Sequence, residues 1–462
     1  MRIQLLLAAT ITLAAVTELP GQGRGRRGRM RPPTEAAPPP AEAPSEKVDD
    51  GPKEYTAIVG GDVYLGTGQR LTGATVLIAD DKIEKVGHDL ELPEGCKRID
   101  ATGKCVSPGF VCVMATGMGA ARSAPFKDGS NPFDPQISQG LAAGITAFLA
   151  GSSGGGNTPS GSNAIAKLAF GDVDGMVAAE DTVVGLNVPL SLADYNRLEE
   201  LVGKAKDYLK ELAAFPAAKA KDPKAQEPRM PGGAEKIVGL LKGETRLWVS
   251  VGGGGFAAFM RRRGGGGGGG GANDVDDIRQ ALAISRLLGQ GIVLNNPISA
   301  WLIPDEIAAT GSMVVLNPRN RVPADPKEPD TTGTNIATAA ILAEAGVPVA
   351  VTPPGGMFGG ASPGTGGILG QDLNTPHVDA AFAVRGGLDN RKALRTITLD
   401  AARAIGAEAR IGSLEAGKDA DILILDGDPL HYATFVETAL VNGKVVYEKA
   451  NDPLFRQIER SR

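Results

Sequence analysis

Eight short, nearly uninterrupted apolar runs alternate with helix-like segments through the middle of this chain. The runs cover residues 109–115, 144–150, 164–170, 182–188, 247–251, 291–294, 313–316 and 347–352. Between many of them apolar residues recur at helical spacing. Strands that are apolar on both faces are typical of parallel sheets covered by helices. The alternation therefore predicts an α/β fold, a (β/α)8 TIM-type barrel over residues 108–407, with a doubly wound open sheet as the competing interpretation.

A different sequence pattern flanks this stretch on both sides. Short β-rich runs occur within residues 54–107 and are separated by turns that favour hairpins. The same pattern of short β-rich runs occurs within residues 408–449, where one hairpin turns at Asn442-Gly443. We expect these two segments to form one small β-sandwich assembled from both ends of the chain, followed by a C-terminal tail over 450–462.

Residues 1–21 have the make-up of a secretory signal peptide. Arg2 precedes an apolar run of the length of a signal h-region, and this run is too short to span a bilayer. Residues 22–53 are rich in Gly, Arg, Pro and Ala without apolar periodicity, which is typical of a disordered linker. A buried N-terminal helix is the alternative, but the linker offers it nothing to pack against. We expect an exported protein, periplasmic or extracellular, without a membrane span.

Charge and composition argue against several function classes. The 462 residues carry a formal net charge of -5, whereas a nucleic-acid binder needs clustered Lys and Arg. The three cysteines lack zinc-site spacing and are expected to be structural. The Gly-rich segment at 151–161 lacks the strand-elbow-helix context of a serine hydrolase. The glycine tract within 252–272 lacks the Gly-Lys-Ser/Thr ending of a phosphate-binding loop and is interpreted as a mobile insertion.

Two motifs resemble the amidohydrolase superfamily. The stretch from Pro108 to Gly117 is similar to the Pro-Gly-hydrophobic-Ile-Asp-x-His-x-His signature of the first barrel strand. The stretch from Ile411 to Asp421 is very similar to the Gly-Ser-Leu-Glu-x-Gly-Lys-x-Ala-Asp motif that leads from barrel to sandwich. A Gly-Ser loop at 151–157 indicates the imidazolonepropionase-like subgroup. This resemblance implies a barrel whose strand ends hold one or two metal ions, which activate a water molecule for hydrolysis.

The same resemblance implies where the metal ligands would stand. Cys112 occupies the position of the signature's aspartate, and Lys167 is the remaining candidate for the bridging lysine, with an ion-paired lysine as the alternative. The histidine and aspartate positions at the strand ends carry other residues: Met114, Thr116, Ser250 or Gly252, Asn296, and Pro354 after Pro353. None of these is a usual metal ligand. The metal-ligand set is therefore expected to be degenerate.

Histidine content limits the site further. The chain has three histidines, and His88 and His431 fall in the expected sandwich segments. A single barrel histidine cannot rebuild a site that needs several. That histidine, His377, is a candidate pocket residue together with Lys167 and with Arg319 after the seventh run, although an exposed or capping histidine is the alternative.

Two functions remain open at this point. The residues favour an exported binding or assembly module that has lost metal-dependent hydrolysis, needs no metal cofactor and takes a small-molecule or amide ligand. The alternative is an active amidohydrolase that uses zinc or another divalent metal at a non-standard site. It would hydrolyse a C–N bond of a small or peptide-derived substrate. The resemblance also suggests a homodimer.

Overall fold

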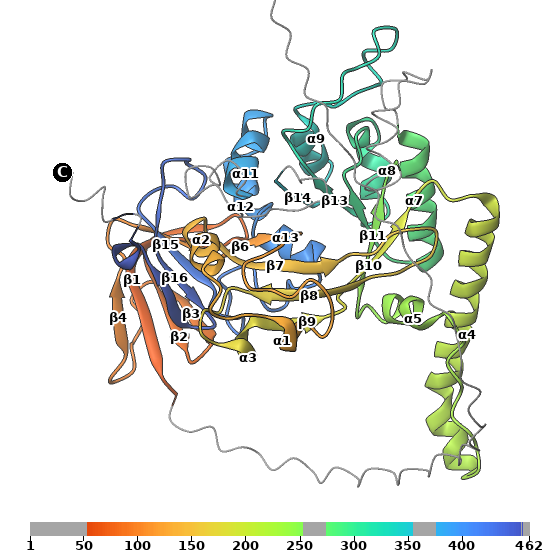
Figure 1. Cartoon of the computed structure of the whole chain (residues 1–462), viewed down its shortest axis with the longest axis horizontal. Coiled ribbons are helices and arrows are strands. Elements are labelled where there is room, and N and C mark those ends of the chain that lie inside the picture. Colours follow the sequence, from red (N-terminus) through yellow and green to blue (C-terminus); the bar gives the residue numbers. More distant parts are fainter. Residues whose placement is uncertain (1–52, 253–273, 354–375, 454, 456–462) are drawn as a thin grey trace, which may run out of the picture. The chain divides into compact units, whose positions relative to one another are not determined.

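The computed structural model describes residues 53–252, 274–353, 376–453 and 455. The expected signal peptide, the linker up to residue 52, nearly all of the Gly-rich insertion, Pro354 and most of the tail lie outside these ranges. Within them the fold is mixed α/β, with three hydrogen-bonded sheets (Figure 1).

The first sheet joins strands from both ends of the chain. Its order is β17-β16-β15-β5-β1-β2-β3, and β4 also pairs with β1. Its strands are β1 (Tyr55–Tyr64), β2 (Arg70–Ala79), β3 (Lys82–Gly87), β4 (Lys97–Asp100), β5 (Cys105–Pro108), β15 (Ile422–Leu425), β16 (Val436–Val441) and β17 (Lys444–Glu448). The joint is β5, which pairs in parallel with β1 and antiparallel with β15. These strands pair as one sheet, so the expected two-sheet sandwich is not confirmed.

The second sheet contains a reversal of direction. Its strands are β6 (Phe110–Cys112), β7 (Ile145–Ser152), β8 (Ser162–Lys167) and β9 (Val177–Glu180). β6 and β7 are parallel, but β8 is antiparallel to both β7 and β9. The expectation of a parallel strand over 164–170 is therefore wrong. Only residues 153–161 connect β7 to β8, whereas a parallel connection needs roughly a dozen residues or more.

The third sheet is parallel throughout and follows the chain order β10-β11-β12-β13-β14. Its strands are β10 (Val183–Asn187), β11 (Arg246–Ser250), β12 (Val293–Asn295), β13 (Met313–Leu316) and β14 (Val349–Val351). Gly185 of β10 bridges to Gly154 and Ser160 of the β7–β8 connection. On the far side, Val351 N donates to Thr396 O and Val111 N to Ile397 O. Among the described residues these contacts approach a ring, but the strand ladders do not close into one barrel.

Helices connect and cover the strands. They are α1 (Phe126–Gly129), α2 (Gln136–Ala142), α3 (Val173–Met176), α4 (Leu192–Lys221), α5 (Glu235–Leu241), α7 (Val275–Leu288), η1 (Ala300–Leu302), α8 (Pro304–Ala308), α9 (Thr338–Glu344), α11 (Pro376–Arg385), α12 (Asn390–Arg395), α13 (Leu399–Ala404) and η3 (Lys449–Asn451). The Ser191 hydroxyl caps α4 by accepting a hydrogen bond from Asp194 N. In the part of the chain that the structure describes, no helix combines the length and the apolar character needed to cross a membrane.

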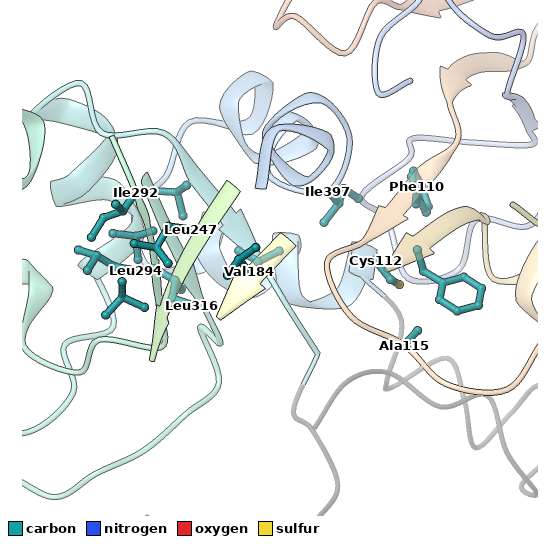
Figure 2. Packing of buried hydrophobic residues seen from close by; sticks show 14 of the residues in the cluster. Phe110, Cys112, Ala115, Val184, Leu247, Ile292, Leu294, Leu316 and Ile397 are labelled. Atoms are coloured by element: carbon teal, nitrogen blue, oxygen red, sulfur yellow. The ribbon is translucent and has the colours of Figure 1, made fainter. Parts of the chain in front are cut away.

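Alternate residues of the strands bury their side chains in two different clusters. The outer cluster includes Leu247, Leu294 and Leu316, and Figure 2 shows part of it. The inner cluster comprises the buried residues Val111, Val113, Ala147, Leu149, Ile165, Val183, Trp248, Val293, Met313, Val315, Ala350, Ala401, Ala402, Ala404, Ile405, Ala407 and Ile411. The Trp248 indole N–H donates to Ala404 O at 2.6 Å. The strands of the second and third sheets therefore pack side chains between them, as barrel folds do in their interior.

Candidate binding site at the ends of the parallel strands

Neutral polar side chains stand where adjacent parallel strands end. Ser250 is the last residue of β11, Asn295 is the last residue of β12, and Asn317 follows β13. Because these strands are parallel, their carboxyl ends lie at one edge of the sheet. Asn295 Nδ2 donates to Ser250 Oγ at 3.4 Å. This edge therefore presents hydroxyl and carboxamide groups.

Asn296 turns the chain at the same edge. Its φ of 54° lies in the left-handed region, which Asn enters more readily than most residues. Its backbone N–H donates to Val315 O at 2.7 Å. The residue is exposed, and no hydrogen bond of its side chain to another described residue is found. Its carboxamide is therefore free to meet a ligand.

A pocket lies between the ends of β12 and β13 and the segment that leads into α9. The space between its lining residues is about 380 Å³, a figure that includes open solvent. Its lining consists of Asn296, Pro297, Ile298, Leu316, Asn317, Pro318, Asn320, Thr334, Asn335, Ile336, Thr338 and Ala339. These lining residues are all uncharged. The pocket thus combines an apolar floor with carboxamides and hydroxyls.

Local turns orient two of the pocket carboxamides. Asn317 Oδ1 accepts a hydrogen bond from Arg319 N at 2.8 Å, and Asn335 Oδ1 accepts one from Ala337 N at 2.9 Å. These contacts use the oxygen of each carboxamide and leave its Nδ2 donors without a partner among the described residues. The pocket therefore offers oriented N–H donors, which suit a carbonyl or hydroxyl oxygen. The sequence analysis missed Asn317, Asn320 and Asn335, because asparagine near a strand end is also typical of turns.

Arg319 lies outside this pocket. Its Nε is 2.8 Å from Asp379 Oδ1 and its Nη2 is 3.3 Å from Asp379 Oδ2. The guanidinium also lies 5.7 Å from the centre of the Phe382 ring. Burial raises the pKa of Asp379 to about 7, although the nearby Arg319 acts to lower it. The guanidinium of this candidate pocket residue is thus committed to an ion pair with α11.

His377 also lies away from the pocket, against β6. Its ring centre is 6.0 Å from that of Phe110, which belongs to the outer cluster. His377 Nδ1 is buried without a hydrogen-bond partner among the described residues. Burial lowers the pKa of His377 to about 4, so the ring is neutral near pH 7. The structure therefore places this candidate residue in a packing role.

The residues at the end of β6 are packed as well. Met114 is half-buried against the inner cluster, and Thr116 is half-buried two residues further on. Cys112 is buried in the outer cluster, where burial raises the pKa of its thiol. None of the three carries an ionised or imidazole group.

Lys167 stands apart from the other candidates. It ends β8 and pairs with Ala147 near the start of β7, so it lies at the opposite end of β7 from Ser152. Its ammonium group is 2.9 Å from both Asp419 Oδ2 and Asp421 Oδ1 and is 1% exposed. The ion-paired alternative fits this environment, and Lys167 lines no part of the pocket.

The donor set does not fit a divalent metal ion. Over residues 53–252, 274–353 and 376–453, no three His, Cys, Asp or Glu side chains converge as a metal site would require. At the strand ends the available donors are thioether, hydroxyl and carboxamide groups. Pro354 lies outside the described residues.

Comparisons with known proteins support the resemblance that the two sequence motifs indicate. Residues 330–447 match the family model described as "Amidohydrolase family". The chain is 42% identical over 64 residues to the imidazolonepropionase of Alkaliphilus oremlandii, and 40% identical over 91 residues to that of Syntrophobacter fumaroxidans. These alignments cover 13% and 20% of the chain, and 15% and 19% of the relatives. These matches support the resemblance of the chain to the amidohydrolase superfamily.

A solved amidohydrolase-superfamily structure resembles the described fold over most of its length. The amidohydrolase from Thermotoga maritima matches with a TM-score of 0.60 and 22% identity, covering 85% of this chain and 100% of that one. This similarity concerns the fold alone. The chain matches only 15% and 19% of the length of the two imidazolonepropionases, so their reaction and substrate do not carry over to it.

Proposed function

We propose that this amidohydrolase-superfamily protein is an exported binding or assembly module that does not carry out metal-dependent hydrolysis. The observation that carries the proposal is the neutral chemistry of the strand ends at Met114, Thr116, Ser250 and Asn296. Hydrolysis in the superfamily needs a metal ion that lowers the pKa of its bound water. Hydroxyl and carboxamide side chains are poor ligands for zinc compared with imidazole, thiolate or carboxylate.

We infer that the ligand is a small neutral molecule bearing amide or hydroxyl groups. The oriented Nδ2 donors of Asn317 and Asn335 favour an oxygen acceptor. The carboxamides of Asn296 and Asn320, which bond no other described residue, can both donate and accept. Ile336 at the rim is 55% exposed and offers an apolar contact. A charged ligand would find no opposite charge in this lining.

Metal analysis of the purified full chain tests the loss of hydrolysis. After incubation with zinc and removal of free ions, elemental mass spectrometry should detect far less than one zinc ion per chain. One tightly bound ion per chain, together with cleavage of amide substrates that a chelator stops, would refute the proposal. An Asn296→Gly variant serves as the matched control for any zinc that is found: it should lose zinc that is bound through the Asn296 carboxamide. Gly tolerates the left-handed backbone, so the substitution removes only this side chain.

The second candidate is an active hydrolase acting on a C–N bond of a small or peptide-derived substrate. The match of residues 330–447 to the amidohydrolase family model and the short matches to two imidazolonepropionases support it. A metal site would then require ligands from residues outside the described ranges. The same zinc experiment separates the two candidates, since only this one expects stoichiometric metal and chelator-sensitive turnover.

We also propose that the protein is exported through the leader over residues 1–21 and forms a homodimer. N-terminal sequencing of protein recovered outside the cytoplasm tests the first point, and an intact leader on cytoplasmic protein contradicts it. Light scattering of the purified chain tests the second, with the mass of one chain as the contradicting result.

A further inference from the structure

Lys167, Asp421 and Asn442 form a buried polar cluster where β8 meets the sheet built from the chain ends. Lys167 is 1% exposed, and its Nζ contacts Asp421 Oδ1 at 2.9 Å and the side-chain oxygen of Asn442. Asp421 is 4% exposed and immediately precedes β15. An amine, a carboxyl group and a carboxamide are therefore in contact in a site that excludes most water.

The Asn442 carboxamide is held from several sides. Its Oδ1 accepts from Lys167, and its Nδ2 donates to Gly175 O at 3.2 Å. Its backbone N–H donates to Asp421 Oδ1 at 3.0 Å, so the turn between β16 and β17 is tied to the same carboxyl group. Held groups of this kind react as if at very high concentration, because the entropy of bringing them together is already lost.

The two aspartates that contact Lys167, Asp419 and Asp421, differ in their other partners. Asp419 contacts Lys82 and Arg410 in addition to Lys167. Burial acts to raise the pKa of Asp419, but these three cations lower it to about 2. The Asp421 Oδ2 atom is buried and has no hydrogen-bond partner among the described residues, and burial raises the pKa of Asp421 despite Lys167. Asp421 is therefore the carboxyl group that can take a proton from Lys167.

We propose that Lys167 and Asn442 become joined by an isopeptide bond, with Asp421 as the proton relay. Asp421 takes a proton from the Lys167 ammonium group, and the neutral Nζ attacks Cγ of Asn442. The Nζ–Cγ bond forms, and the protonated Asp421 gives its proton to Nδ2 and takes a second proton from Nζ, so that it ends the reaction protonated. The Cγ–Nδ2 bond then breaks and ammonia leaves. The reaction exchanges one amide for another and needs no oxidant, reductant or further reactant.

The surroundings suit both the leaving group and the product. Asn442 is only half-buried, so ammonia has a path to solvent. The product replaces the ammonium group with a neutral amide, while Asp421 ends protonated and Asp419 keeps its ion pairs with Lys82 and Arg410, so no buried carboxylate is left without a partner. The bond would link residues 275 positions apart and tie β8 to the β16–β17 turn. Like a disulfide, it would restrict the unfolded chain more than the folded one.

Peptide mapping of the full chain tests the proposal directly. A tryptic digest should contain a branched peptide joining residues 128–197, uncut after Lys167, to residues 419–444, lighter than the sum of the two by one ammonia molecule. Fragmentation should place the branch at Lys167 and Asn442. Complete recovery of the linear peptides 128–167 and 419–444 would overturn the proposal.

Two variants separate this reaction from other routes to the same mass. Lys167→Arg keeps the charge but removes the nucleophile, so the loss of ammonia should disappear. If that loss persists in Lys167→Arg, it arises from ring closure within Asn442-Gly443 and the proposal fails. Lys236→Arg, which changes a partly exposed lysine paired with Asp181, should leave the branched peptide unchanged.

The role of Asp421 has its own readout. In Asp421→Asn, the branched peptide should be absent or form many times more slowly after refolding than in the wild type. Formation at the wild-type rate would overturn the relay role. If this variant does not fold, the rate of branching in the wild type at different pH values serves instead. It should fall in acid, where Asp421 is already protonated and cannot accept the proton of Lys167.

Discussion

Arg319 reaches across from the end of β13 to hold Asp379 of α11 by two contacts, at 2.8 and 3.3 Å. The Asp379 side chain is fully buried, whereas that of Arg319 is 20% exposed. The pair fixes α11 against the edge of the parallel sheet. The ion pair contributes to stability mainly because the buried carboxylate of Asp379 cannot be solvated if Arg319 is lost.

Replacing Arg319 with Met should therefore destabilise the protein strongly. Removing one partner of a buried pair typically costs about 3–5 kcal/mol, with part of that cost relieved when the carboxyl group takes up a proton. Arg279→Met is the matched control, because Arg279 makes a similar two-contact pair with Glu306 on the surface. The control should cost less than about 1 kcal/mol. Urea denaturation of both variants measures the difference, and equal losses would contradict the assignment.

His377 and Asp379 should oppose each other in the dependence of stability on pH. The pKa of His377 falls from 6.5 to about 4 on folding, so its contribution is lost as pH falls through that window. The pKa of Asp379 rises from 3.8 to about 7, so its contribution is lost as pH rises through an overlapping window. In His377→Gln, stability should fall as pH rises from about 4 to 7. In Asp379→Asn, it should fall as pH drops from about 6.5 to 4. Urea midpoints across this pH range check both slopes, and parallel curves would show that neither group titrates as described.

Gly109 should not tolerate even a methyl group. A Cβ at this position would lie 1.9 Å from Oγ1 of Thr146, which is 1% exposed and cannot move into solvent. Overpacking of this kind costs roughly 1–3 kcal/mol or more, so Gly109→Ala should lower the melting temperature clearly. Gly203→Ala provides the control, because this glycine lies within α4 with nothing within 4 Å of its added Cβ. That change should stabilise the helix by roughly 0.5–1 kcal/mol. Calorimetry of both variants tests the contrast.

Trp248 should contribute more to stability than Trp301, the second of the two tryptophans. Its indole N–H bonds Ala404 O inside the inner cluster, whereas that of the half-buried Trp301 donates to Gly333 O at 3.3 Å. Trp248→Phe leaves a buried carbonyl unsatisfied, which costs about 1–3 kcal/mol, and adds a small cavity. Trp301→Phe should cost less. Chemical denaturation followed by circular dichroism compares the two, and the opposite order would place the main packing role at Trp301.

The strand positions followed from the sequence because burial on both faces leaves a simple pattern. Leu247 and Val249 meet the outer cluster and Trp248 meets the inner cluster, so the whole run is apolar. The same pattern says nothing about direction, since an apolar run is alike when parallel or antiparallel. For β8 only the short connection over 153–161 carried that information.

The candidate site was harder to predict, because side-chain partners lie far apart in the sequence. Asp379 stands 60 residues from Arg319, so nothing near Arg319 indicates that its charge is neutralised. Lys167 meets Asp419 at a separation of 252 residues. Asn296 was found through the family motif. Asn317 and Asn335 were not, because their carboxamides form turns as well as line the pocket.

The place of β5 between β1 and β15 sets an order of events for synthesis. Until the segment carrying Ile422–Leu425 has left the ribosome, one edge of β5 has no neighbour to pair with. An unpaired edge is a template for association with other chains. Nascent chains that stall before Ile422–Leu425 has been made should therefore aggregate, even when they contain the whole central α/β region. Proteins truncated before this strand should aggregate in the same way.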